Sequence, residues 1–263
     1  MTTTNEPVLL RRDDGRVAVL TLNRPAAMNA LSGELIDSLQ REFDRLAKES
    51  EIRCVIIEAN GRAFSSGHDL REVRSSDKYA FHYDLITRCS AMMMTIHRLP
   101  QPVIAKVHAI ATAAGCQLVA ACDLAVASSD ASFATPGVNI GLFCGTPSVP
   151  LGRNVGSKRA LDMLFTGEPI SAETALRDGL VSRVVPPAEL DTATMALAQT
   201  IAGKSPLVLA QGKELFHKHM EMGLEQAYAY ASANMAGALM REDAKLGIDA
   251  FVNKQGLPEW TGR

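Results

Sequence analysis

The sequence predicts an α/β fold that is followed by an all-helical C-terminal region. Short apolar runs rich in β-branched residues, such as Cys54–Ile57 and Val103–Val107, alternate with longer segments of helical periodicity. After Pro187 the strand-like runs stop, and helical periodicity continues almost to the end. Apolar residues make up 47% of the 263 residues, enough for a sizeable core in one large domain or in a core with an appendage.

The N-terminal elements follow from local patterns. Two strands are expected at Val8–Arg12 and Val17–Leu22, joined by the turn signal Asp13–Gly15. Ser32 is a suitable N-cap for the next segment, in which apolar residues recur at three- and four-residue spacing. The short apolar run Cys54–Ile57 is typical of a strand buried on both faces.

The middle of the chain continues the alternation. We expect a helix at Tyr79–Leu99, because Pro100 would end it, and a strand at Val103–Val107. The segment Ala109–Ala121 consists almost entirely of small and aliphatic residues and predicts a helix that is buried on all sides. Asp123–Ala127 predicts another strand.

The C-terminal quarter predicts four helices, at Glu189–Ala202, Pro206–Met220, Leu224–Met240 and Asp243–Phe251. The third has one continuous apolar stripe, which either packs in the core or joins subunits; the second interpretation is favoured. We therefore divide the chain into a core of residues 1–200 and a helical oligomerisation region of residues 201–263.

Composition argues against several classes of partner and site. A formal net charge of −2 gives no reason to expect a nucleic-acid partner or an acidic membrane surface. The lysines and histidines of residues 213–219 predict an exposed helix face, and no pattern of metal ligands is present. No G-x-G-x-x-G or G-x-S-x-G motif occurs.

Cysteine usage and the N-terminal residues bear on location. The five cysteines are an odd number without a C-x-x-C pair, which indicates a reducing compartment and no disulfide framework. Residues 1–7 are polar and lack the pattern of a signal or transit peptide. We expect a cytoplasmic protein.

Two small-residue segments suggest chemistry. Ser65–Leu70 predicts a strand-to-helix junction, in which Gly67 permits an unusual backbone angle. Ala113–Gly115 predicts the start of the second buried helix. Unpaired amides at a helix start attract negative charge. If the two segments face each other, two N–H groups could donate to one oxygen, as in an oxyanion hole for a thioester carbonyl that becomes an enolate.

Several motifs together resemble the crotonase superfamily, the enoyl-CoA hydratase/isomerase group. The resemblance runs nearly from end to end, and Ser66–Leu70 with Phe133–Asn139 indicates one subgroup within it. The matching segments are Leu22–Pro25, Met28–Leu31, Ala63–Leu70, Pro102–Val107, Cys122–Asp123, Phe165–Ala172 and Gly179–Val181. The resemblance implies a spiral of β-β-α turns, a C-terminal helical region that forms trimers or paired trimers (hexamers), and binding of acyl-coenzyme A thioesters. It implies no cofactor beyond the coenzyme A of the substrate.

The resemblance also assigns residues. The backbone amides of His68 and Ala114 would form the oxyanion hole. Phe251 and Lys254 would reach the nucleotide part of coenzyme A, often across a subunit boundary. The other residues implied in coenzyme A or substrate binding are Arg24, Ala26, Ala27, Ala63, Ser65, Ser66, Gly67, Asp69, Leu70, Gly115 and Pro136.

The two glutamates that hydratases of this family use are missing. Gln117 and Gly137 occupy their positions, and Leu85–Cys122 and Ala131–Leu161 contain no Asp or Glu at all. General acid–base help is worth about 10²–10⁴-fold, so most of the hydratase rate should be lost.

Other residues come into question for proton transfer or nucleophilic chemistry, and three functions stay open. Near the site by motif position are His68, Asp69, Glu72, Cys116, Asn139 and Cys144. The functions are an enzyme that uses His68, a cysteine or an ordered water, a non-catalytic acyl-CoA-binding protein, and a purely structural oligomer.

Overall fold

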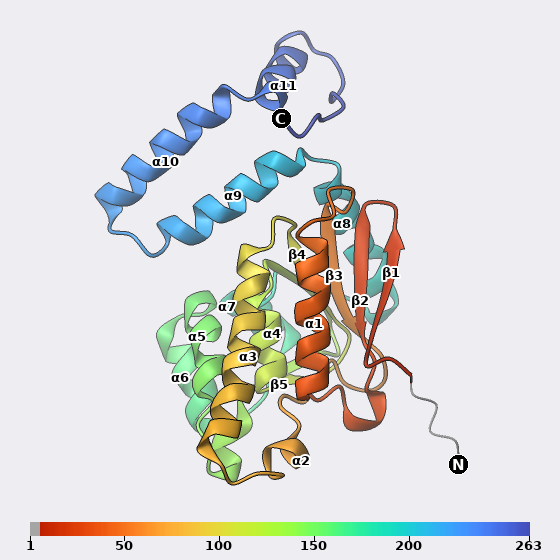
Figure 1. The fold of residues 1–263 in the computed structure, drawn as a ribbon, viewed down its shortest axis with the longest axis vertical. Helices are drawn as coiled ribbons and strands as arrows, with labels where there is room; N and C mark the ends of the chain where they lie inside the picture. Colours follow the sequence, from red (N-terminus) through yellow and green to blue (C-terminus); the bar gives the residue numbers. More distant parts are fainter. Residues whose placement is uncertain (1–5) are drawn as a thin grey trace.

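A six-stranded sheet forms the centre of the computed structural model, which describes residues 6–263 (Figure 1). Its strand order is β1-β2-β3-β4-β6-β9. The bounds are β1 Leu9–Asp14, β2 Val17–Leu22, β3 Cys54–Ala59, β4 Val103–Val107, β6 Leu124–Ser128 and β9 Arg183–Val185. Only β1 runs antiparallel to its neighbour, so the carboxyl ends of the other five strands meet at one edge, called here the carboxyl edge.

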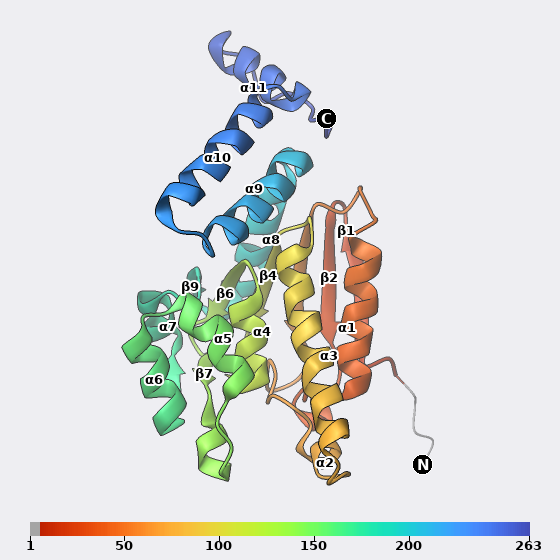
Figure 2. The same ribbon diagram turned by 60° about the vertical axis from the view of Figure 1, so that its left-hand side comes forward.

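Helices cover both faces of this sheet (Figures 1 and 2). On β2 the side chains alternate: Ala18 and Leu20 belong to the cluster that contains α1 and α3, whereas Val17 and Val19 pack with α8. Strands covered on both faces read as continuous apolar runs, which is why they were recognisable in the sequence. The α-helices are α1 Gly33–Leu46, α2 Leu70–Val73, α3 Tyr79–Arg98, α4 Ala114–Ala121, α5 Gly145–Asn154, α6 Ser157–Thr166, α7 Ala172–Asp178, α8 Leu190–Ala202, α9 Pro206–His219, α10 Leu224–Leu239 and α11 Glu242–Val252.

A second, three-stranded sheet lies near the carboxyl edge. It consists of β5 (Ala111–Thr112), β7 (Ser132–Ala134) and β8 (Ile170–Ser171). Strands β5 and β7 are parallel and end together, with Thr112 opposite Ala134. Three single-turn 3₁₀ helices, η1 Pro25–Ala27, η2 Pro136–Ile140 and η3 Pro187–Glu189, complete the described elements.

Most expected elements are confirmed within one or two residues, but one boundary is wrong. The helix expected from Ala109 begins at Ala114, because Ala111 and Thr112 pair with β7 instead. Helix α4 is otherwise as expected, with all eight residues buried. Helix α5 was not expected, since Pro147 and Pro150 lie within it.

Helices α9, α10 and α11 extend from the opposite edge, where the parallel strands begin, called here the amino edge (Figures 1 and 2). Lys213 of α9 holds this region to the core. Its Nζ donates to Asp123 Oδ2 at 2.6 Å, to the carbonyl of Ile96 at 2.7 Å and to that of Gln101 at 3.0 Å. Its side chain is only 7% exposed.

His217 joins this cluster. Its Nε2 lies 3.4 Å from both Asp123 Oδ1 and His97 Nδ1. Burial, with the neighbouring His217 second, lowers the pKa of His97 to about 4, so His97 is neutral at pH 7. The prediction of an exposed basic face is therefore wrong for Lys213 and His217. Asp123, a partly buried residue far away in the sequence, pairs with this surface and makes it an interface.

The last residues fold back onto the same edge. The buried Asp243 accepts hydrogen bonds from Ser205 Oγ, from the amide and hydroxyl of Thr261, and from the Gly262 amide. Trp260 donates from its indole to the Gly203 carbonyl. No helix within residues 6–263 is long and apolar enough to cross a bilayer.

Candidate functional site

The loop before α2 crosses the carboxyl edge and touches the start of α4. Gly67, with φ of +90°, makes the contact. A Cβ atom on Gly67 would lie 2.8 Å from Ala113 Cβ and 3.2 Å from the Ala114 nitrogen. Gly115 is equally close to the loop, since its Cβ would lie 2.4 Å from the Ser65 carbonyl oxygen. Only glycine permits these approaches, so the two predicted segments do meet.

The backbone at the start of α4 is strained. Ala113 has φ of +50° and ψ of −120°, a conformation that costs a non-glycine residue of order 1–3 kcal/mol. The strand pairing holds it, because the Ala113 amide donates to the Ala134 carbonyl at 2.9 Å. This turn presents the amide of Ala114 at the N-terminus of α4.

The His68 amide is freed in a different way from the one we expected. Helix α2 begins at Leu70 with Asp69 as its N-cap, so the His68 amide does not belong to a helix start. His68 instead forms an isolated parallel bridge with Leu31, which uses the Gly67 carbonyl and the Asp69 amide. Neither the His68 nor the Ala114 amide has an acceptor within residues 6–263, so each is available to a ligand.

Asn29 braces this loop, and the residue-by-residue assignment missed it. It is fully buried with φ of +51°. Its side-chain Nδ2 donates to the backbone carbonyls of Asn60 at 2.7 Å and Ala63 at 2.8 Å. Its backbone carbonyl accepts a hydrogen bond from the Ser65 hydroxyl at 2.9 Å. The signal was present in the resembling segment Met28–Leu31, where Asn is one of the few residues that tolerate a positive φ.

Arg24 and Asp69 form an ion pair that ties two predicted substrate-binding segments together. Arg24 Nη2 lies 2.9 Å from Asp69 Oδ2, and its Nη1 donates to the Ala30 carbonyl. Asp69 also accepts from the amides of Arg71 and Glu72. The hydrogen bond from Arg24 is the main reason that the pKa of Asp69 is lowered. Asp69 is thus ionised and engaged, which makes it a poor general base.

Three side chains at this edge have buried polar atoms without a hydrogen-bond partner among the described residues. They are Gln117 with its Oε1, Thr135 with its Oγ1, and His68 with both ring nitrogens. Burial lowers the pKa of His68, so the imidazole is neutral at pH 7 and offers one donor and one acceptor. Such atoms cost about 1–3 kcal/mol each unless something binds them.

The second glutamate position is closed. A Cβ on Gly137 would lie 2.2 Å from the Leu142 carbonyl oxygen and 2.8 Å from Cys144 Sγ. The nearby thiols are not ready nucleophiles. Burial raises the pKa of Cys116 to about 12, and burial also raises that of Cys144. Asn139 is exposed, and its amide lies against Gly167.

Several predicted binding residues lie near the site but differ in exposure. Ala63 and Ser65 are buried and support the loop rather than face a ligand, whereas Leu70 is 53% exposed. Ala26 is exposed, and Ala27, Ser66 and Pro136 are partly exposed.

Phe251 and Lys254 are not brought to the site. They lie on and after α11, beyond the amino edge of the same chain (Figures 1 and 2). Phe251 is 85% exposed.

Comparison with known proteins agrees with the expected family. Mouse enoyl-CoA hydratase domain-containing protein 3, mitochondrial, is 47% identical over 95% of this chain and 83% of its own length. The crystal structure of an enoyl-CoA hydratase from Mycobacterium smegmatis superposes with a TM-score of 0.95 at 50% identity, covering 97% of this chain and 99% of that one. The crystal structure of human enoyl-CoA hydratase domain-containing protein 3 superposes with a TM-score of 0.93 at 46% identity, covering 95% of this chain and 99% of that one. The subgroup indicated by Ser66–Leu70 and Phe133–Asn139 is confirmed.

The expected cytoplasmic location is contradicted. The mouse, rat and human relatives are all named as mitochondrial, which points away from the cytoplasm. The expectation rested on cysteine usage and on the seven N-terminal residues, and these features carry too little physical information to decide a compartment.

The family model described as enoyl-CoA hydratase/isomerase matches residues 12–263. That span includes both edges of the sheet and the C-terminal helices. The chain belongs to the enoyl-CoA hydratase/isomerase family, the crotonase superfamily.

Proposed function

We propose that this protein binds acyl-coenzyme A thioesters and polarises their carbonyl group, with little hydratase activity. The thioester oxygen would accept hydrogen bonds from the amides of His68 and Ala114. The observation that supports this proposal is the contact of Gly67, the residue before His68, with the start of α4, together with the lack of an acceptor for either amide within residues 6–263. Donors of this kind stabilise an enolate more than the ground-state carbonyl.

Hydration needs a group that takes a proton from water as the water attacks Cβ. The amide of Gln117 orients a water molecule but does not accept its proton near pH 7. Gly137 offers no side chain, and the two nearby thiols are held protonated. The site therefore supports binding and carbonyl polarisation better than water addition.

A second function is favoured by one observation. His68 holds a neutral imidazole with two buried, unpartnered nitrogens in the same residue whose amide faces the thioester. Such a ring could remove a proton from Cα, giving the enolate that the hole stabilises, and return it. The reaction would be proton exchange at Cα or movement of a double bond rather than hydration.

Assembly belongs to the same proposal. We propose a homotrimer, or two trimers paired into a hexamer, in which Phe251 and Lys254 of one subunit reach the nucleotide of a coenzyme A bound to its neighbour. The distance of α11 from the site within one chain supports this arrangement, as does the exposed apolar stripe of α10, which includes Leu224, Tyr228 and Met235. Light scattering measures the mass of the assembly in solution, and a monomer at micromolar concentration would contradict the proposed trimer or hexamer.

The test of the main proposal combines binding and turnover. Butyryl-CoA should bind in calorimetry, while hydration of crotonyl-CoA should be at least about 10²-fold slower than in a hydratase with both glutamates. Failure to bind any coenzyme A thioester would reject the acyl-CoA assignment. Rapid hydration would reject the claim of a degenerate site.

Restoring the glutamates separates the two positions. Gln117→Glu should raise the hydration rate, since its side chain already lies on the first turn of α4. Adding Gly137→Glu would restore the second glutamate as well. The structure argues against a further gain in rate, because the new Cβ would lie 2.2 Å from the Leu142 carbonyl oxygen. The double variant should therefore be less stable and no faster than Gln117→Glu.

The second function has its own measurement. Butyryl-CoA in D₂O should exchange its Cα protons with wild-type protein, followed by NMR. His68→Ala keeps the backbone amide, so it should bind butyryl-CoA normally and lose the exchange. Exchange that survives in His68→Ala excludes the imidazole as the base.

A further inference from the structure

The segment that carries His68 runs beside the residues that lead into α1. The Leu31 amide donates to the Gly67 carbonyl at 2.7 Å, and the Asp69 amide donates to the Leu31 carbonyl at 3.3 Å. In a parallel bridge of this kind, the residue between the two bonded neighbours turns its own amide away from the partner strand. The direction of the His68 amide is therefore set by where this pairing holds the segment.

One further contact joins the same two segments beyond the bridge. The Glu72 carboxylate accepts a hydrogen bond from the Gly33 amide, with 2.8 Å between Oε2 and the nitrogen. Gly33 is the first residue of α1, so its amide has no carbonyl within the helix to bond. The negative charge of Glu72 also suits the positive end of this helix. Glu72, which came into question for proton transfer, thus has its carboxylate engaged at the start of α1.

Gly33 makes room for this carboxylate. A Cβ atom on Gly33 would lie 2.9 Å from Glu72 Oε1 and 3.3 Å from Arg88 Nη2. The φ of Gly33 is not positive, so the space rather than the backbone conformation requires a glycine. Arg88 is occupied elsewhere, since its guanidinium pairs with Asp37 at 2.7 Å and with Asp84 at 2.8 Å. The start of α1 is therefore shaped to receive the Glu72 side chain.

Glu72 lies near the end of the segment that is held in place. Residues 74–78 are mostly exposed, and α3 begins only at Tyr79. On the side nearer to His68, the ion pair of Asp69 with Arg24 provides another attachment. Glu72 is also close enough to act on the His68 ring: burial lowers the pKa of His68, and the charge of Glu72 opposes this in part.

We propose that Glu72 is a positioning residue for the oxyanion hole, an inference that rests on the proposed function. By holding residues 67–72 against Gly33, Glu72 keeps the His68 amide directed at the thioester oxygen. It acts through the backbone of His68 rather than by contact with the substrate. Because the strength of a hydrogen bond falls steeply with its angle, a small shift of this segment would weaken the polarisation of the carbonyl without preventing binding.

The carbonyl stretch of bound butyryl-CoA tests the proposal. Butyryl-CoA with and without ¹³C at the carbonyl gives a difference infrared spectrum in which the protein bands cancel. Preorganised donors to the oxygen weaken the C=O bond, so the wild-type protein should lower the stretching frequency relative to the free ligand. Glu72→Ala should lose at least about half of this shift. The Kd of butyryl-CoA, from calorimetry, should rise less than about tenfold, the worth of one hydrogen bond.

Three further variants separate positioning from a general effect. Glu72→Gln keeps a side-chain oxygen for the Gly33 amide and should retain most of the shift. Gly33→Ala leaves the charge of Glu72 in the protein but puts a methyl group where the carboxylate lies, and should lose the shift as Glu72→Ala does. Glu34→Ala removes an exposed carboxylate from the first turn of the same helix and should leave the shift unchanged.

The outcomes distinguish this inference from the proposed function. Wild-type protein that binds butyryl-CoA without lowering the frequency would reject the oxyanion hole itself. A shift that survives in both Glu72→Ala and Gly33→Ala would reject the role of Glu72 alone, even if the melting temperature of either variant fell. An equal loss in Glu34→Ala would assign the effect to charge at the helix end rather than to the contact. If Glu72→Ala does not fold, Gly33→Ala, which keeps every charge, decides the question.

Discussion

The two edges of the central sheet treat buried polar groups in opposite ways. At the amino edge, the charged side chains of Asp123, Lys213 and Asp243 each have three or more hydrogen bonds inside the protein. At the carboxyl edge, the neutral side chains of Gln117 and Thr135 keep buried atoms without partners. These three charged groups are satisfied where the C-terminal helices attach, and hydrogen-bonding capacity is left unused at the edge where we propose the oxyanion hole.

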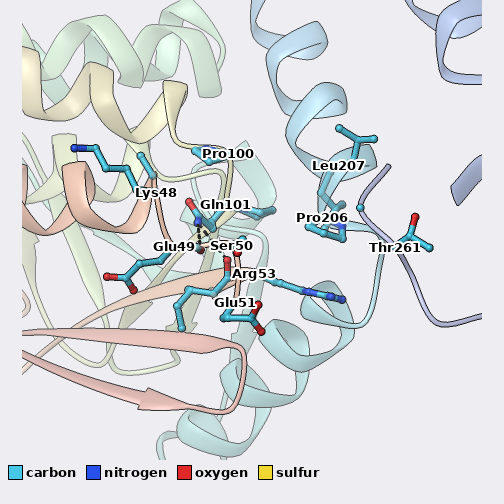
Figure 3. A pocket seen from close by; sticks show the side chains of 15 residues that line it. Lys48, Glu49, Ser50, Glu51, Arg53, Pro100, Gln101, Pro206, Leu207 and Thr261 are labelled. Carbon is cyan, nitrogen blue, oxygen red and sulfur yellow. Dashed lines mark hydrogen bonds between the residues drawn. The ribbon is translucent and has the colours of Figure 1, made fainter. Parts of the chain in front are cut away.

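The difference separates attachment from binding. A buried charge without a partner costs several kcal/mol, so a structural junction must satisfy each one. A neutral polar atom without a partner costs about 1–3 kcal/mol, a loss that a ligand can recover when it binds. Arg53 and Gln101, which line a pocket there (Figure 3), are the exceptions at the amino edge, because the buried Arg53 Nε and Gln101 Oε1 have no partner among the described residues.

The largest effect is expected from breaking the attachment. Lys213→Met removes a buried cation with three acceptors and leaves Asp123 in a poorly compensated position. It should destabilise the protein by about 3–5 kcal/mol in urea denaturation. Lys218→Met, five residues along the same helix, removes an exposed lysine that pairs with Glu214 and should change stability little. Similar losses in the two variants would contradict the difference between the edges.

The second largest effect is expected from a substitution at Gly67, next to the proposed oxyanion hole. Gly67→Ala places a Cβ against Ala113 and forces φ of +90° on a residue with a side chain. We expect a loss of about 2–4 kcal/mol and a fall of at least about 10²-fold in any enolate exchange rate.

Gly141→Ala is the matched control for that variant. Gly141 has φ of +76°, and nothing lies within 4 Å of its Cβ position. It should show only the backbone penalty of about 1–2 kcal/mol. If both variants exchanged protons equally well, Gly67 would not be part of the hole.

A pH series tests the ion pair between Arg24 and Asp69 at the carboxyl edge. The pKa of Asp69 is lowered in the folded state, so its contribution is fully present above the ordinary pKa of about 3.9 and is lost as the pH falls below it. Arg24→Gln should therefore cost about 1–2 kcal/mol at pH 7, and less as the pH falls from about 4. Arg74→Gln breaks an exposed pair with Asp77 and should cost little at any pH. A cost for Arg24→Gln that does not change with pH would mean that only its bond to Ala30 matters.

The smallest effect on stability is expected from removing one of the unpartnered polar atoms at the carboxyl edge. Thr135→Val deletes a hydroxyl group without a partner, so the unfolding free energy should stay the same or rise by up to about 1 kcal/mol. Thr194→Val is equally buried but loses the bond of its hydroxyl to the Leu190 carbonyl, and should cost about 1 kcal/mol. Thermal unfolding of both variants measures the two changes in unfolding free energy. An equal loss of stability in both would show that the Thr135 hydroxyl has a partner in solution.

Much of the fold was accessible from the sequence, because local patterns determine it. Strands such as Val17–Leu22 are continuous apolar runs, and Ser32 caps α1 as expected. What failed depended on contacts between distant residues. The segment at Ala111 became a strand because Phe133 lies beside it, and Lys213 became buried because Asp123 reaches it.

The site was predicted through its motifs rather than through its geometry. The amides of His68 and Ala114 have no acceptor within residues 6–263, and their joint role as an oxyanion hole stays a prediction. The reason given for His68 was wrong, since a bridge to Leu31 rather than a helix start frees its amide. The lack of space for a side chain at Gly137 could not be anticipated, because it depends on how the following loop places the Leu142 carbonyl beside Gly137.

The fastening of the last residues has a practical consequence. Asp243 is 1% exposed and takes most of its hydrogen bonds from Thr261 and Gly262. Trimming these residues would leave an uncompensated anion inside the junction. A fluorophore joined after Arg263 would sit beside the turn between α8 and α9, at the opposite end of the same chain from Gly67 and Ala114. Such a label would report the docking of the tail onto the core.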